Sequence, residues 1–160
     1  MKDILLFAGL MVLPSSVSRQ QHAATAVIPS DPRLRRLEEF FAKRDCPLRT
    51  AAADFLIAAD QNALDWRLLP SISIIESSGG KDYRKNNVFG WDSCREGFSS
   101  VRAGIHFVAA QLSQAKQYRD KTLEMKLRTY NPNPDYPLKV KAVMRALAPN
   151  PAAKLAPQAN

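Results

Sequence analysis

Residues 68–80 read LLPSISIIESSGG, an apolar helical pattern that ends in one acidic residue and two glycines. Leu69, Ile72 and Glu76 are three and four positions apart, so a helix brings all three to one face. Pro70 is tolerated only near the start of such a helix. The glycines predict its end, because glycine readily takes the left-handed conformation that follows a helix.

Glu76 is the most informative residue of this stretch. A carboxyl group on an apolar helix face is partly desolvated, which disfavours its charged form and raises its pKa. A raised pKa is what a general acid needs in order to protonate a leaving oxygen near neutral pH. The alternative is a solvated glutamate at the frayed end of a buried helix.

Helical signals also flank this stretch. Asp31-Pro32 predicts an N-cap and a first-turn proline for a helix that Cys46-Pro47 ends. Ser99 or Ser100 can cap a helix that begins at Val101. The other helices are predicted over about 49–59, from Asp65 to Glu76, over 122–129, and from Asp135 to Leu147. We therefore predict a mainly α domain of about five or six helices, in which the loop 81–97 could hold a small β-hairpin.

The composition is typical of one globular domain with a hydrophobic core and a basic surface. The chain has 160 residues, 46% of them hydrophobic, and a net charge of +8. That length is enough for one globular domain, which we expect to be a monomer. The charge favours an anionic partner. Nucleic acid is not predicted, because no aromatic-basic interleaving, zinc spacing or helix-turn-helix pattern is visible, and no residue cluster predicts a metal or cofactor.

The first residues resemble an export signal. Lys2 precedes an apolar run over 4–13, which is too short to span a bilayer, and Ala24-Thr25-Ala26 fits a cleavage site. Cleavage near Ser18 and an apolar helix of a cytosolic domain are the alternatives. We expect a periplasmic or secreted protein without stable membrane insertion after cleavage. The predicted organisation is a signal peptide over 1–26, a domain over 27–148 and a disordered tail over 149–160.

Cys46 and Cys94 are the two cysteines of the chain. In an oxidising compartment we expect them to form a disulfide, which could stabilise the fold by about 4 kcal/mol in the chain-entropy model. The alternative is two free thiols in a reducing cytosol.

Two further motifs carry groups suited to sugars. Residues 87–91 read NVFGW, and Tyr130-Asn131 opens a loop held by two prolines. Aromatic rings stack on the apolar faces of pyranoses, and amides pair with N-acetyl groups and hydroxyls. Tyr118 could face the same cleft or the core.

These motifs together resemble a known family. The stretch 68–80 resembles the catalytic helix of lysozyme-like muralytic enzymes, and Asn87-Val88-Phe89-Gly90 is similar to the Asn-x-Phe-Gly motif of glycoside hydrolase family 73, the endo-β-N-acetylglucosaminidases. Tyr130 with Pro134-Asp135-Tyr136 and Lys139-Val140 resembles the closing pattern of that family. The resemblance covers about residues 64–147.

The resemblance implies a lysozyme-like fold, peptidoglycan or a related N-acetylated glycan as substrate, and roles for individual residues. Glu76 would protonate the glycosidic oxygen, and Tyr130 would hold the substrate or the developing charge. The substrate-binding residues implied are Ser77, Asn87, Phe89, Gly90, Trp91, Asn131 and Tyr136.

The chain departs from the family pattern at several positions. Ser78 stands where family members usually have the first glycine of Glu-Ser-Gly-x-Gly, and Trp91-Asp92 replaces a lysine that often follows Phe-Gly-x. A hydrolase usually needs a second carboxylate. The candidates are Asp82, Asp92 and Glu96, and assistance by the substrate N-acetyl group is the alternative.

Three functions follow as hypotheses. The first is hydrolysis of β-1,4 bonds between N-acetylated sugars. The second is lytic transglycosylation, because Glu-Ser-Ser and Tyr-Asn also resemble those enzymes, although their Gly-Leu-Met-Gln signature is missing. The third is a non-catalytic module that binds the cell wall.

Overall fold

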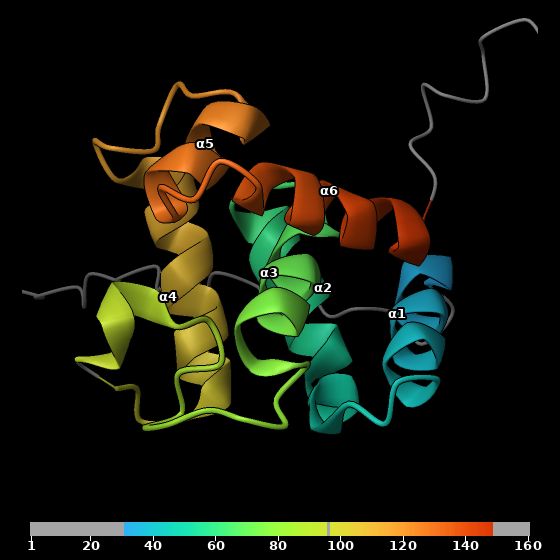
Figure 1. The fold of residues 1–160 in the computed structure, drawn as a ribbon. Helices are drawn as coiled ribbons and strands as arrows, with labels where there is room; N and C mark the ends of the chain where they lie inside the picture. Colours follow the sequence, from blue (N-terminus) through green and yellow to red (C-terminus); the bar gives the residue numbers. More distant parts are fainter. Residues whose placement is uncertain (1–30, 96, 149–160) are drawn as a thin grey trace, which may run out of the picture.

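The computed structural model describes residues 31–95 and 97–148, which form a mainly α domain (Figure 1). No strand is found within these ranges, which confirms the predicted fold class. The helices are α1 (Pro32–Ala42), α2 (Ala52–Gln61), α3 (Leu68–Ser77), α4 (Val101–Gln114), α5 (Leu123–Tyr130) and α6 (Tyr136–Leu147), with 3-10 turns η1 (Pro47–Ala51) and η2 (Trp91–Cys94).

Helix α3 lies at the centre of the domain and is the most apolar of its helices. It packs against α6 on one side and α2 on another, while α2 also packs against α4 (Figure 1). Leu69 and Ile72 are completely buried on α3, and Phe55 is completely buried on α2. Burying side chains of this size contributes about 1.5–3 kcal/mol each. The last turn of α3, which holds Glu76, is therefore anchored on a rigid core.

The starts of α1 and α4 follow the capping chemistry predicted from the sequence. The Asp31 carboxylate accepts a 2.8 Å hydrogen bond from the Arg33 amide, and the Ser100 hydroxyl accepts from the Ala103 amide at 3.1 Å. These two bonds satisfy amide groups that a helix leaves without a partner at its start. Helix α3 begins at Leu68, later than predicted, and has no side-chain cap; the Asp65 carboxylate accepts from the Arg67 amide at 3.0 Å in the turn before it.

Asp135 stands at the N-cap position of α6, where the sequence predicts the helix to begin, but its side chain does not cap the helix. Asp135 precedes the helix but makes no side-chain cap bond, because its backbone is already helical (φ −83°, ψ −12°) and not extended. The turn is held instead by the Asn133 side chain, which accepts from the Asp135 amide at 2.9 Å. This turn fixes the loop between α5 and α6.

The segment between α3 and α4 is an irregular turn and not a β-hairpin. An isolated bridge joins Arg84 and Asn87, and the 3-10 turn η2 follows. Asp92, Ser93 and Cys94 have φ values of 50°, 53° and 56° in succession. Left-handed residues turn the chain sharply, whereas a hairpin strand needs extended backbone. The expected hairpin is therefore absent from the described part of this loop.

The predicted disulfide is also absent from the structure. Cys46 is buried with its thiol near the Arg44 and Ser78 carbonyl oxygens, and Cys94 is a half-exposed residue of η2. Both cysteines are free thiols in the structure. Burial raises the pKa of the Cys46 thiol.

The predicted signal peptide over 1–26, residues 27–30 and the whole predicted tail over 149–160 lie outside the described residues. Among residues 31–95 and 97–148, no helix has the length and apolar character needed to cross a membrane.

Candidate active site

The C-terminal end of α3 turns sharply and thereby presents Glu76. Ser78 adopts a left-handed conformation (φ 51°), and Gly79 and Gly80 follow with φ values of 72° and 86°. The Gly79 amide donates to the Ser73 carbonyl at 3.1 Å, which closes the helix end. The two glycines are needed here, because a Cβ on Gly80 would lie 2.7 Å from the Leu48 side chain. The predicted stop is confirmed, with a serine as its first left-handed residue.

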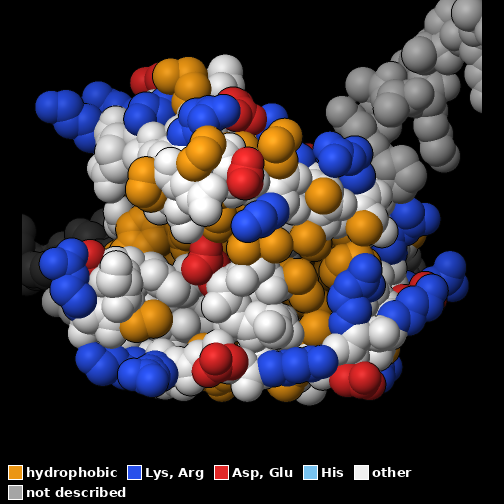
Figure 2. All heavy atoms as spheres, viewed as in Figure 1, with side chains coloured by type: hydrophobic (Ala, Val, Ile, Leu, Met, Phe, Trp, Pro, Cys, Tyr) orange, Lys and Arg blue, Asp and Glu red, His pale blue; other side chains and the backbone are white. Residues whose placement is uncertain are grey.

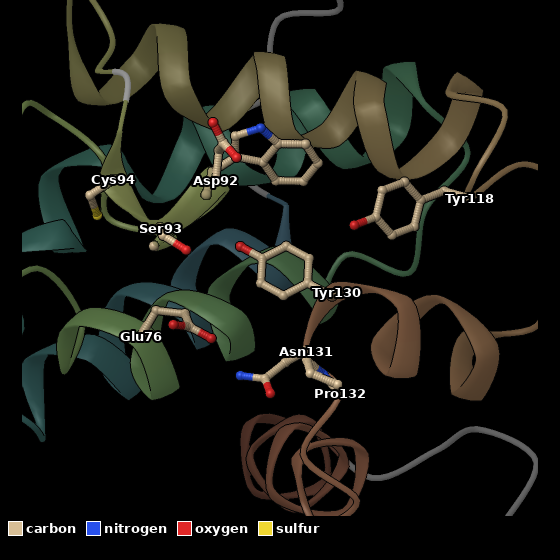
Figure 3. Close-up of a pocket in the computed structure, with 10 residues that line it drawn as sticks. Glu76, Asp92, Ser93, Cys94, Tyr118, Tyr130, Asn131 and Pro132 are labelled. Carbon is tan, nitrogen blue, oxygen red and sulfur yellow. The ribbon is translucent and has the colours of Figure 1, made fainter.

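Glu76 lines a cleft of about 660 Å³, a volume within the usual range for small-molecule sites. Figure 3 shows the side chains of Glu76, Tyr130 and Asn131 converging from α3 and the end of α5. On the face shown in Figure 2, Lys and Arg side chains lie mostly along the edges. The lining residues are Glu76, Gly90, Trp91, Asp92, Ser93, Cys94, Tyr118, Tyr130, Asn131 and Pro132.

The Glu76 carboxyl group is half-buried, and this burial raises its pKa above the ordinary value for glutamate. Gly90 lies directly against it, since a Cβ placed on Gly90 would be only 2.8 Å from Glu76 Oε2. Desolvation disfavours the carboxylate, so the protonated form persists to higher pH than in a solvated glutamate. The predicted partial burial of Glu76 and the predicted direction of its pKa shift are confirmed.

Tyr136 is the polar group packed most closely beneath this carboxyl. Its hydroxyl is near enough to Glu76 to lower the pKa of the carboxyl, which partly offsets the effect of burial. However, no hydrogen bond of ordinary length and angle satisfies the buried Tyr136 hydroxyl within the described residues. An O–H donor without a partner is therefore positioned to bond to Glu76 when that group is ionised.

Tyr130 is fixed in the cleft by contacts on both sides. Its ring stacks on the Tyr136 ring (centroids 5.9 Å apart, planes 8° apart) and meets the Trp91 ring edge-on at 5.7 Å. Its hydroxyl donates a 2.5 Å hydrogen bond to the Phe89 carbonyl oxygen. Burial, followed by the nearby Glu76 charge, raises the pKa of Tyr130 well above its usual value, so this phenol stays protonated.

Asn87 shapes the turn that carries Trp91. Its side-chain amide donates to the Trp91 carbonyl at 2.9 Å, and its side-chain oxygen accepts from the Trp91 amide at 3.0 Å. This pair of bonds closes a ring over residues 87–91, with Gly90 (φ 61°) inside it. Asn87 therefore sets the position of both Gly90 and the Trp91 indole.

The structure brings some of the predicted site residues to the cleft and buries the others. Glu76, Gly90, Trp91, Tyr130 and Asn131 line it. Ser77, Asn87, Phe89 and Tyr136 were expected to contact substrate, but each is at most 3% exposed and none lines the cleft.

Each of these four buried residues has a structural partner that explains its burial. The Ser77 hydroxyl donates to the Ser73 carbonyl at 2.9 Å, and Phe89 packs edge-on against Phe55 in the core. Asn87 and Tyr136 support Trp91 and Tyr130 as described above. These residues position the site from below and do not form its surface.

Of the two candidates for a second carboxylate that the structure describes, Asp92 lines the cleft and Asp82 does not. Arg95 binds both of its carboxylate oxygens, and this hydrogen bonding lowers the pKa of Asp92. Asp82 is exposed outside the cleft. Glu96 lies outside the described residues.

The cleft also contains residues that the sequence did not mark. Ser93, Cys94 and Pro132 line it, and Tyr118, whose role was left open between cleft and core, packs at 6.0 Å from the Trp91 ring. No sequence signal identifies Ser93 and Cys94, because they reach the cleft through the left-handed backbone of η2. For Tyr118, the one sequence signal for a place in the cleft is that it is an aromatic residue just past the end of α4.

The sequence matches no protein-family model and no curated protein. The site must therefore be interpreted from its own geometry. Within residues 31–95 and 97–148, no group of three or more His, Cys, Asp or Glu side chains is arranged to hold a metal ion. What the arrangement does provide is a half-buried carboxyl group with a raised pKa at the edge of an aromatic cleft, which is suited to donating a proton to a bound ligand.

Proposed function

We propose that this protein cleaves β-1,4 bonds between N-acetylated sugars of peptidoglycan, with Glu76 as its general acid. The observation that carries the proposal is the half-buried Glu76 carboxyl, with its raised pKa, at the wall of a cleft lined by Trp91, Tyr118 and Tyr130. A proton donor for the leaving oxygen and flat aromatic surfaces for the sugar rings are two of the features that a glycan-cleaving site uses.

The chemistry begins with transfer of the Glu76 proton to the glycosidic oxygen, as the bond to the anomeric carbon breaks. Glu76 then becomes a carboxylate in a partly desolvated place. The unpartnered Tyr136 hydroxyl can donate to it at that moment, which stabilises the conjugate base. Positive charge developing on the sugar ring would be faced by the Tyr130 ring and by the Glu76 carboxylate itself. A water molecule then forms the new bond to the anomeric carbon and gives its proton to a carboxylate, either Asp92 or Glu76, so that the products are two neutral sugar ends.

The basic surface supports the choice of an anionic glycan. The chain carries a net charge of +8, which attracts polyanions over distances comparable to the Debye length. The stem peptides and associated polymers of a bacterial wall bear carboxylate and phosphate groups. Association with wall should therefore weaken as salt is raised.

A second candidate is lytic transglycosylation, in which a hydroxyl of the substrate sugar replaces water as the nucleophile. The specific observation in its favour is the engagement of both Asp92 oxygens by Arg95. Among the described residues that line the cleft, Glu76 and Asp92 are the carboxylates, so this pairing leaves Glu76 as the one that is not bound by an arginine there. A mechanism with one acid, which takes back its proton from the attacking hydroxyl, fits that arrangement.

The experiment compares release of soluble fragments from purified peptidoglycan by the wild-type chain, Glu76→Gln and Glu39→Gln. Glu39 is an exposed glutamate on α1 that is paired with Arg35, and it is the matched control. General acid catalysis typically contributes about 10²–10⁴-fold, so Glu76→Gln should lose at least that much. Full activity in Glu76→Gln would refute its role.

The products distinguish the remaining alternatives. Mass spectrometry of fragments shows a reducing end after hydrolysis and an internal anhydro ring after transglycosylation. Asp92→Asn should abolish hydrolysis if Asp92 is the base, and leave transglycosylation within about threefold of the wild type. Retention of the folded protein on wall without release of any fragment would instead support a binding module.

A further inference from the structure

A second, smaller hollow adjoins the cleft. It has a volume of about 190 Å³ and is lined by Trp91, Asp92, Gly97, Phe98 and Phe107. Trp91 and Asp92 also line the large cleft, so the two hollows meet across these two residues. A ligand seated in the Glu76 cleft would therefore have this hollow as its neighbour at Trp91 and Asp92.

The walls of this hollow are aromatic and partly open to solvent. Phe98 and Phe107 lie with ring centroids 5.4 Å apart, and the Trp91 ring meets Phe107 edge-on at 6.0 Å. Phe107 is 43% exposed, although a phenylalanine on a helix gains free energy by burying its ring. An exposed aromatic at the margin of a cleft is a surface on which a ligand ring can stack.

The hollow is held in shape by backbone contacts. The Phe98 amide donates to the Lys85 carbonyl at 2.9 Å, and the Phe98 carbonyl accepts from the Asn86 side chain at 2.9 Å. Gly104 on α4 provides the space for the Phe98 ring, because a Cβ there would lie 2.7 Å from that ring. The aromatic wall is thus fixed before any ligand arrives, which reduces the entropy cost of binding.

We propose that the hollow formed by Trp91, Phe98 and Phe107 binds a further sugar of the same glycan strand, beyond those bound in the Glu76 cleft. This inference rests on the proposed function and extends it, since it makes the substrate a chain of several sugars. The continuity of the two hollows at Trp91 supports a second sugar over a separate ligand. The apolar walls fit the carbon-bound hydrogen face of a pyranose or an N-acetyl methyl group.

The test measures binding of β-1,4-linked N-acetylglucosamine oligomers, from the disaccharide to the hexasaccharide, by the Glu76→Gln chain, which does not consume them. Phe107→Ala is introduced into that chain, with Phe107→Tyr as the variant that keeps the ring. Leu138→Ala is the control, because Leu138 is 64% exposed on α6 and lines neither hollow. Circular dichroism and thermal unfolding verify that each variant is folded.

We expect Phe107→Ala to weaken binding of the longest oligomers by about 3- to 10-fold, in line with the loss of one aromatic contact. Binding of the shortest oligomers should not change, and Phe107→Tyr should restore the affinity for long ones. An equal loss at every length, or no loss at any length, would overturn the subsite. An effect seen only with strands that carry stem peptides would assign the hollow to peptide and overturn a sugar occupant.

Failure of this inference is distinguishable from failure of the proposed function. If the hexasaccharide binds more tightly than the disaccharide but Phe107→Ala has no effect, the subsite is refuted and the glycan-cleaving function stands. If neither oligomers nor wall fragments bind to the Glu76→Gln chain, both proposals are refuted together.

Discussion

Replacing Gly90 by alanine tests whether the close approach of Gly90 to Glu76 positions the carboxyl group for catalysis. Gly90 has φ 61°, and its absent Cβ would lie 2.8 Å from Glu76 Oε2 and 3.5 Å from the carboxyl carbon. The group in the way is the far end of a flexible side chain and not backbone. We therefore expect the Glu76 carboxyl to move aside while the fold remains intact.

The two effects have different magnitudes. A left-handed conformation costs a residue with a Cβ about 1–2 kcal/mol, while replacing glycine reduces the entropy of the unfolded chain and returns about 0.4–1 kcal/mol. The free energy of unfolding should thus fall by roughly 1 kcal/mol. A displacement of the reacting group by about 1 Å can cost about 10²-fold in rate, so activity should fall much further than stability.

The assay is urea unfolding combined with fragment release, measured for Gly90→Ala, Glu76→Ala and the double variant. Glu76→Ala removes the carboxyl group, so Gly90→Ala in that background shows the loss of unfolding free energy that comes from the backbone alone. The difference between the two backgrounds in this double-mutant cycle measures the steric clash between the new Cβ and the Glu76 carboxyl. Gly90→Ala with activity within threefold of the wild type would refute the close approach. Loss of several kcal/mol of unfolding free energy in both backgrounds would show that the backbone, and not the Glu76 carboxyl, moves to make room.

Three further predictions concern stability. Ser78→Gly should raise the free energy of unfolding by about 0.5–1 kcal/mol in urea, since it relieves a left-handed serine at the end of α3. Asn87→Ala should lower it by about 1–3 kcal/mol, because the Trp91 amide and carbonyl lose their partners, and tryptophan fluorescence should shift. Glu76→Gln should be more stable than the wild type at about pH 7.5 and equal to it at about pH 3.5, as measured by urea unfolding. The sign follows from the raised pKa: the full stability of the wild type is present below the unfolded-state pKa and declines as pH rises through the folded-state pKa.

Local features of the fold could be predicted from the sequence because they depend on neighbouring residues. The Asp31 and Ser100 caps, the glycine stop after Ser78 and the apolar face of α3 are all determined within a few positions along the chain. The partial burial of Glu76 follows from the same periodicity. These features located the catalytic candidate without any knowledge of tertiary contacts.

The identity of the surface residues could not be predicted in the same way. The motif at 87–91 contains an amide and an aromatic ring that suit a sugar, but nothing local shows which side chains point inward. Phe89 faces the core and Asn87 bonds to its own turn, whereas Trp91 faces the cleft. The three left-handed residues of η2 are likewise unexpected, because Asp92, Ser93 and Cys94 have no glycine among them.

The buried residues of the predicted motifs do not distinguish an enzyme from a binding module, whereas Glu76 does bear on that choice. Asn87, Phe89 and Tyr136 support the cleft from beneath, so a protein that only binds glycan would need them as much as an enzyme would. Glu76 is different, because a half-buried carboxyl pressed against Gly90 destabilises the fold at neutral pH and gives binding no evident advantage. The proposed proton donation would use such a group, and this is the physical argument that favours the proposal of catalysis over one of binding alone.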